Sequence, residues 1–317
     1  MTMANNKIDL IYIASTGRSG STLLESILGA HSQMATAGEI HVWSRNIIEG
    51  GSIPCGCGKP VPECSFWQQM ERRVEPLQQP KPQIDFFRDK YNAGKTLRLS
   101  RLPEFFLDRQ SASLQQQIDI YGQNNQQFFT AFNELIESEK GTKPTWIVDS
   151  SKDPYRLLWL LNSGLFNIKV LQVVKDPRAF VYSMSKDLLK QNRAGIKVQL
   201  LHRTVMKSLS WIVQNSLFKQ IANKYVDSAD YIFVPYEKLA SAPQQTLREI
   251  CTTIGCEYEE QAIANFRNNN MHTIAGNPMR FREGGIVLDE TWKLSLPTKY
   301  RKLTEMITGN IYQFISS

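Results

Sequence analysis

The stretch from Lys7 to His31, "KIDLIYIASTGRSGSTLLESILGAH", predicts a buried strand that turns directly into a helix. Its first part is a short apolar, β-branched run that ends in small residues, a pattern typical of buried strands. Four apolar residues then recur at helical spacing: Leu23, Leu24, Ile27 and Leu28. Gly17 and Gly20 therefore belong to the turn between the strand and the helix.

This turn has the composition of a cradle for a phosphate or sulfate group. Backbone N–H groups of a glycine-rich turn point inward, and the N-terminus of the helix adds a partial positive charge. Arg18 supplies a fixed charge, and Ser19, Ser21 and Thr22 supply hydroxyl groups. The NTP-binding pattern G-x-x-x-x-G-K-[ST] is not met, because no Lys-Ser or Lys-Thr pair closes the loop. An ordinary tight turn is the alternative for so short a motif.

Three more buried strands are predicted further along the chain. They are "TWIVDSS" (Thr145 to Ser151), "IKVLQVV" (Ile168 to Val174) and "DYIFVPYE" (Asp230 to Glu237). Helical stretches separate them, and this alternation predicts an α/β fold, a three-layer sandwich with a central parallel sheet. In such sheets ligands bind beyond the carboxyl ends of the strands.

The pattern changes between Val42 and Lys143. The run "GGSIPCGCGKPVPECSFW" is rich in turn formers, and a glutamine-rich run with the spacing of polar helices follows it. We interpret residues 42–143 as a mostly helical insertion packed over the sheet. No internal repeat or linker divides the 317 residues, so we interpret 1–317 as one domain.

Charge and hydropathy bound the environment of the protein. The formal net charge of +7 favours an anionic ligand, although a solvated basic surface explains it equally well. No apolar stretch is long enough to span a membrane, and the N-terminus has no basic region followed by an apolar block. Five cysteines without a secretory signal predict a reduced, cytoplasmic protein with no membrane partner.

Basic residues follow two of the predicted strands. Lys152 stands in "DSSKDPYR", and Lys175 stands in "VVKDPRAFVYSMSKD". Ser183 lies eight residues after Lys175, within a predicted helix. Singly, each is an ordinary polar residue at a strand end or on a helix. Because parallel strands end at the same edge of a sheet, we expect these residues and the glycine turn to face one ligand.

Together these segments resemble the PAPS-dependent sulfotransferases, which have a P-loop-NTPase-like fold and use 3′-phosphoadenosine-5′-phosphosulfate (PAPS). The resemblance covers the chain from about Ile11 to Lys293, and the insertion only loosely. It implies that the loop "GRSGST" holds the 5′-phosphosulfate, with Arg18 in the place of the family's basic residue. It also implies that Lys175 and Ser183 hold the 3′-phosphate, although the family more often has arginine at the first position.

Two later segments extend the resemblance. In "VPYEKLASAP" it places Tyr236 near the nucleotide. In "HTIAGNPMRFREGGIVLDETWKLSL" it implies a segment that closes over the cofactor, with Arg280 as the first choice for a phosphate contact and Arg282 as the second. His272, which lies beside this segment, is interpreted as structural.

Sulfuryl transfer requires charge stabilisation and a base for the proton of the acceptor. Arg18 and Lys152 are the candidates for stabilising charge, and we expect no catalytic metal. In the tyrosylprotein sulfotransferases a glutamate in a similar Gly-Glu segment acts as base, assisted by a lysine in an Asn-Lys-Asp-Pro segment. The resemblance carries these roles to Glu39 and Lys152, while His41 in "AGEIH" stays open as the alternative base.

The three cysteines of "CGCGKPVPEC", Cys55, Cys57 and Cys64, are a partial metal-binding pattern. Zinc prefers four ligands, and His41 would be a distant fourth. A reduced turn rich in glycine and proline is therefore the default interpretation, and whether these cysteines bind a metal stays open.

The resulting functional prediction is a PAPS-dependent sulfotransferase that yields 3′-phosphoadenosine 5′-phosphate (PAP). Its acceptor would be a hydroxyl or an amine nitrogen of a small molecule, such as a natural product, a sugar or a lipid, as in bacterial secondary metabolism. No nucleic acid partner is expected, and the oligomeric state cannot be read. One alternative is a P-loop small-molecule kinase that uses ATP. Another is a non-catalytic protein that binds a nucleotide or RNA through its basic surface.

Overall fold

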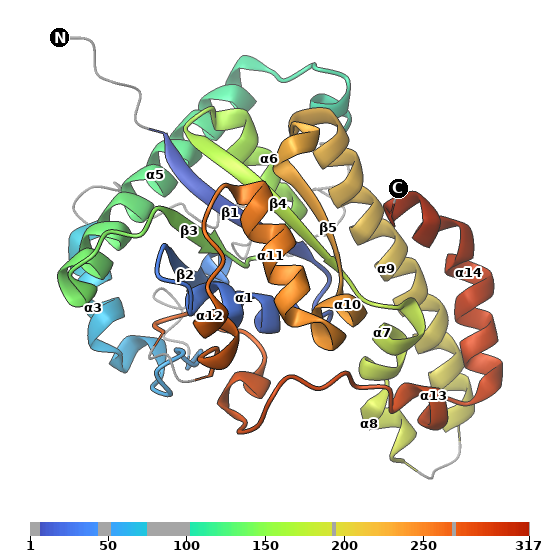
Figure 1. Ribbon diagram of the computed structural model, residues 1–317. Coiled ribbons are helices and arrows are strands. Elements are labelled where there is room, and N and C mark those ends of the chain that lie inside the picture. The colour runs from blue at the N-terminus through green and yellow to red at the C-terminus, as the bar shows by residue number, and fades with distance from the viewer. Residues whose placement is uncertain (1–6, 44–51, 75–101, 192–194, 268–270, 317) are drawn as a thin grey trace.

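The sheet is parallel throughout and has five strands in the order β2-β3-β1-β4-β5 (Figure 1). The computed structural model describes residues 7–43, 52–74, 102–191, 195–267 and 271–316. The strands are β1 (Ile8–Ser15), β2 (Met34–Gly38), β3 (Trp146–Asp149), β4 (Phe166–Val174) and β5 (Tyr231–Pro235). The predicted α/β fold with a central parallel sheet is confirmed.

Strand β1 is the centre of the sheet. It pairs with β4 along its whole length, from Ile8 opposite Phe166 to Ser15 opposite Val173. On its other side it pairs with β3, with Tyr12 opposite Asp149. The carboxyl ends of β1, β3 and β4 therefore meet at one edge of the sheet, where the sequence predicted a ligand.

Helices enclose the sheet on both faces. The helices are α1 (Ser21–Gly29), α3 (Ser65–Val74), α5 (Ala112–Lys140), α6 (Pro154–Ser163), α7 (Pro177–Ser183), α8 (Lys186–Leu189), α9 (Ile196–Tyr225), α10 (Tyr236–Ser241), α11 (Pro243–Ile254), α12 (Glu260–Ala264), α13 (Trp292–Ser295) and α14 (Thr298–Ser316). Short 3-10 helices are η1 (Ile40–Val42), η2 (Val61–Glu63), η5 (Ser228–Asp230) and η6 (Pro278–Phe281). None of the described helices is long and apolar enough to cross a membrane.

The side chains of β1 alternate between two apolar cores, as the period of two in a strand requires. Leu10 and Tyr12 belong to the core shared with α3, α5 and α6. Ile11 and Ile13 belong to the core shared with α1, α11 and α12. The sheet is thus the middle of three layers, with α5 behind it and α11 in front of it in Figure 1.

The described parts of the predicted insertion, residues 42–143, are mostly helical. Helix α5 begins at an N-cap where Ser111 accepts a hydrogen bond from the N–H of Leu114, and it ends at Gly141 in the left-handed region. Aromatic side chains of α3 and α5, including Trp67 and Phe128, pack together in the core over the sheet. Residues 44–51 and 75–101 of the insertion lie outside the described residues. The interpretation of the chain as one domain stays a prediction.

Candidate active site

A cleft of about 610 Å³ lies at the carboxyl edge of the sheet. It brings together most of the residues that the sequence singled out. These are Gly17, Arg18, Gly20, Ser21, Thr22, Glu39, Lys152, Lys175, Ser183 and Tyr236. Ser19 and Arg280 are not among the residues that line this cleft. The roles of all twelve stay predictions.

The glycine turn is held in a shape that only glycine fits at one position. Gly20 precedes α1 with a φ of +96°, in the left-handed region that glycine enters freely. A Cβ atom there would lie 2.2 Å from Cδ2 of Tyr236. Ser19 is fully buried, and its hydroxyl forms a 2.5 Å hydrogen bond with that of Thr16. The side chain of Ser19 therefore stabilises the turn from its buried side.

The residues predicted to bind the 3′-phosphate lie beside the turn. Nε of Arg18 donates to Oγ of Ser183 over 2.8 Å, so Ser183 lies against the glycine turn. Nζ of Lys175 lies 3.9 Å from the centre of the Tyr236 ring, and burial lowers the pKa of this lysine. A buried ammonium group that has lost solvent gains from an anion placed against it.

The predicted catalytic pair is in direct contact. Nζ of Lys152 donates to Oε1 of Glu39 over 2.6 Å, and the two side chains are only 12% and 20% exposed. The N–H of Glu39 is held by the carbonyl of Ile274 at 2.9 Å. Lys152 adopts a φ of +58°, a strained conformation for a residue with a side chain.

Gln214 of α9 is a positioning residue that the sequence reading missed. Its side-chain N–H group donates to the carbonyl of Lys152 at 3.1 Å and to the carbonyl of Ser15 at 3.2 Å. One amide therefore holds the ends of two strands, β1 and β3, at a fixed separation. A polar residue in a long helix gives no sign of this role in the sequence.

A buried ion pair fixes the chain on either side of Lys152. Asp149, at the end of β3, accepts a hydrogen bond from Nε of Arg156 at 2.7 Å and another from the N–H of Ser151 at 2.9 Å. Nη1 of Arg156 donates to the hydroxyl of Tyr121 in α5 at 2.6 Å. Both charged side chains are almost completely buried. This network holds the strand end from which Lys152 projects.

His41, the alternative base, lies outside the described lining of the cleft. It is buried, and its backbone N–H donates to Oγ of Ser151 at 3.2 Å. Glu39 lines the cleft and His41 does not, and the choice of base between them stays a prediction.

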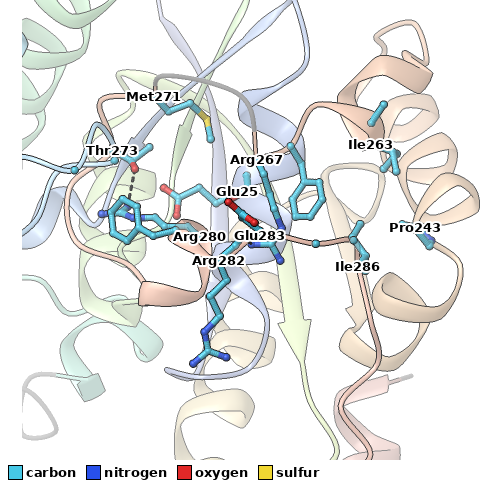
Figure 2. A pocket seen from close by; sticks show the side chains of 18 of the residues that line it. Glu25, Pro243, Ile263, Arg267, Met271, Thr273, Arg280, Arg282, Glu283 and Ile286 are labelled. Atoms are coloured by element: carbon cyan, nitrogen blue, oxygen red, sulfur yellow. Dashed lines mark hydrogen bonds between the residues drawn. The ribbon is translucent and has the colours of Figure 1, made fainter.

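A second cavity, of about 790 Å³, adjoins the cleft (Figure 2). The two share Arg267, Arg282, Glu283, Gly285 and Ile286. Arg280 lines only the second cavity, where it donates to Oγ1 of Thr273 at 2.7 Å and to the carbonyl of Pro54 at 3.0 Å. Arg282 extends in another direction in Figure 2, so the structure brings the second choice for a phosphate contact, rather than the first, to the cleft.

Glu25 of α1 is a buried carboxyl group that the sequence reading did not single out. It is 3% exposed and lines the second cavity. Burial raises its pKa to about 7, although Lys152 and Arg280 lower it. The available signal was the glutamate as the one charged residue in the helix "STLLESILG".

We expect the stability of the protein to depend on pH through Glu25. The folded state holds its proton up to a pH of about 7, whereas an ordinary glutamate releases it near 4.5. Stability from this group is therefore present below pH 4.5 and is lost as the pH rises through 7. The free energy of unfolding of Glu25→Gln, measured in urea and relative to wild type, should be about 3 kcal/mol higher at pH 8 than at pH 4.

The control is Gln116→Ala, because Gln116 is exposed and carries no titratable group. Its difference in stability from wild type should stay constant with pH. An equally flat difference for Glu25→Gln would contradict the buried, protonated carboxyl group.

A family model described as "Sulfotransferase family" matches residues 62–260, which is more than half of the chain. The chain belongs to the sulfotransferase family. This membership confirms the family prediction and the prediction of a sulfotransferase enzyme. It gives no support to the kinase alternative or to the RNA-binding alternative.

Solved structures agree on the fold of this sulfotransferase. The "Sulfotransferase Domain from the Curacin Biosynthetic Pathway" aligns with a TM-score of 0.54 at 20% identity, over 96% of this chain and 98% of that chain. The "Sulfotransferase Domain from the Synechococcus PCC 7002 Olefin Synthase" aligns with a TM-score of 0.53 at 17% identity, over 96% and 95%. No curated protein matches the sequence.

Proposed function

We propose that this sulfotransferase transfers a sulfuryl group from PAPS to a hydroxyl or an amine nitrogen of a small-molecule acceptor. The contact between Glu39 and Lys152, inside the cleft that also contains Arg18, carries the proposal. A carboxylate base and two cations are then within reach of one ligand.

The cleft fits an anion with two phosphate groups. Arg18 and Lys152 line it near the glycine turn, and Lys175 and Lys186 line it near Ser183. Glycine at position 20 keeps space for the ring of Tyr236, which a Cβ atom would displace. We propose that the glycine turn binds the 5′-phosphosulfate and that Lys175 and Ser183 bind the 3′-phosphate of PAPS, with Arg282 as a further phosphate contact.

The proposed chemistry assigns one task to each side chain. Glu39 accepts the proton of the acceptor as the acceptor oxygen or nitrogen bonds to sulfur. The bond from sulfur to the 5′-phosphate oxygen breaks, and its electron pair leaves with PAP. Arg18 and Lys152 stabilise the negative charge that develops on that oxygen. The contact at 2.6 Å orients the Glu39 carboxylate before the acceptor arrives.

A biosynthetic intermediate is the acceptor class that we favour. The two structural relatives above are named for a biosynthetic pathway and for an olefin synthase. Incubating the enzyme with labelled PAPS and a metabolite extract tests the proposal, with mass spectrometry to detect products that gain a sulfuryl group. No product with PAPS, together with tight binding of ATP, would contradict it.

Lys175→Ala is expected to weaken PAP binding tenfold or more and to leave AMP binding nearly unchanged. The reason is that losing a charge-assisted contact to a phosphate costs about 1.5–3 kcal/mol, and only PAP has a 3′-phosphate. Isothermal titration calorimetry measures both affinities. Lys238→Ala is the control, because Lys238 does not line the cleft and pairs with exposed Glu249. Equal losses for PAP and AMP would remove the assignment of the 3′-phosphate site.

A further inference from the structure

Three cysteines and one histidine from distant parts of the chain converge on one point. Cys55, Cys57 and Cys64 come from the turn that precedes α3, and His272 comes from the segment that follows α12. Four potential ligand atoms, the three Sγ atoms and one ring nitrogen, all lie within 4.8 Å of one another. His272 is the fourth member of this cluster, where the sequence reading had named only His41 as a distant candidate.

The separations between these atoms fit a tetrahedral metal site. Zn–S bonds of about 2.3 Å and Zn–N bonds of about 2.0–2.1 Å in a tetrahedron place two sulfurs about 3.8 Å apart and a sulfur and a nitrogen about 3.5 Å apart. Sγ of Cys57 lies 3.7 Å from Sγ of Cys64. Nδ1 of His272 lies 3.2 Å from Sγ of Cys64 and 3.8 Å from Sγ of Cys55.

The cysteines are free thiols rather than a disulfide. All three are unpaired, and 3.7 Å between Cys57 and Cys64 far exceeds an S–S bond of about 2.05 Å. Cys55 and Cys64 are buried. Three thiols gathered around one imidazole nitrogen, two of them shielded from solvent, are the ligand set of a Cys₃His zinc site.

The surroundings of His272 orient its ring in the manner of a metal ligand. Nδ1 faces the sulfurs, while Nε2 lies 4.0 Å from Oε2 of Glu139 in α5. Histidine ligands generally direct their second nitrogen to an acceptor of this kind. At 4.0 Å the carboxylate is an electrostatic neighbour and not a hydrogen-bond partner. The ring also stacks on Phe66, with the centres 4.8 Å apart and the planes within 5°, and this stacking holds its orientation.

We propose that Cys55, Cys57, Cys64 and His272 bind one Zn²⁺ ion in a structural site. Thiolate-rich, four-coordinate ligand sets select zinc among the common divalent ions. Four protein ligands leave no open position for substrate or water, so the ion has no direct part in the reaction.

The site joins the cysteine turn to the segment that lines the cleft. The N–H of Gly56 donates to the carbonyl of Thr273 at 2.8 Å. The next residue, Ile274, supplies the carbonyl that holds the N–H of Glu39 at 2.9 Å. Asn277, which lines the cleft, donates its N–H to Oγ1 of Thr22 at 3.1 Å. The ion therefore supports the position of Glu39 through backbone contacts.

Metal analysis of the purified, reduced chain tests the inference, because zinc content does not depend on the reaction. Wild type, grown with zinc supplied, is expected to carry one zinc per chain by inductively coupled plasma mass spectrometry. Cys57→Ser, at the least buried of the three cysteines, should lose most of it. His202→Ala is the control for the ligand substitutions, because His202 is exposed and belongs to neither group of possible metal ligands, and it should keep its zinc.

Two further measurements keep the test decisive if Cys57→Ser fails to fold. His272→Cys should retain zinc, since Cys₄ is also a zinc ligand set, whereas His272→Ala should lose it. Wild type loaded with Co²⁺ should show the intense visible bands of tetrahedral cobalt thiolate. Three results would overturn the proposal. They are the absence of zinc from wild type, the persistence of zinc in His272→Ala, and a Cys57–Cys64 disulfide detected in the native chain by mass spectrometry.

Discussion

Glu39→Gln is expected to lower turnover by about 10²–10⁴-fold, the usual cost of removing a general base. Glutamine keeps the size of the side chain and can still accept the hydrogen bond from Lys152, which is 2.6 Å long in the wild type. The substitution therefore removes the basic oxygen and the negative charge while keeping the shape of the side chain. Affinity for PAP should stay within a few-fold of wild type, because the proposed phosphate contacts come from other residues.

The control is His41→Ala, which should lose much less activity. His41 is buried, so its removal can destabilise the protein. The melting temperature of the variant must therefore be compared with that of wild type before the rates are compared. A dead His41→Ala variant beside an active Glu39→Gln variant would reverse the roles of the two residues. Full activity in both variants would show that another group takes the proton.

Asp149→Ala is expected to reduce the free energy of unfolding by about 3–5 kcal/mol. The change leaves the charge of Arg156 buried without its carboxylate partner at 2.7 Å, and it removes the acceptor of the Ser151 N–H. Urea unfolding followed by circular dichroism measures the loss. Activity should also fall, because these contacts hold the strand end before Lys152.

Two comparisons distinguish the effect of the buried Asp149–Arg156 pair from the effect of removing any ion pair. Glu249→Ala breaks an exposed ion pair with Lys238 and should cost less than about 1 kcal/mol. The double variant of Asp149→Ala with Arg156→Met should lose less than the sum of the single losses, because it leaves no unpaired charge. Additive losses would mean that the two side chains contribute independently of their contact.

The sequence predicted the four strands that contain β-branched runs. It did not predict β2, which has none. β2 reads "MATAG", and alanine and glycine are poor strand formers, so only its pairing with β3 over Met34 to Gly38 makes it a strand. Its burial on all five residues comes from the layers around it. Local propensity carries no information about such tertiary support.

Part of the candidate site could be predicted because its residues follow strands directly. Lys152 and Lys175 stand where strands end, so the edge of a parallel sheet brings them together. The segment around Arg280 follows no strand, so the edge of the sheet does not place it, and the choice between Arg280 and Arg282 rested on the family resemblance alone. The contact of His272 with the cysteines was not predicted either. His272 lies 208 residues from Cys64 along the chain, and no local pattern connects the two.

The contact between Glu39 and Ile274 has a consequence for protein synthesis. The partner carbonyl of the Glu39 amide is 2.9 Å away but belongs to a residue translated much later. While a nascent chain still lacks Ile274, it can form β1 and the glycine turn without completing the wall of the cleft. The hydrogen bond of the Glu39 amide therefore forms only after Ile274 has been translated and has left the ribosome, and amide exchange at Glu39 should slow at that stage.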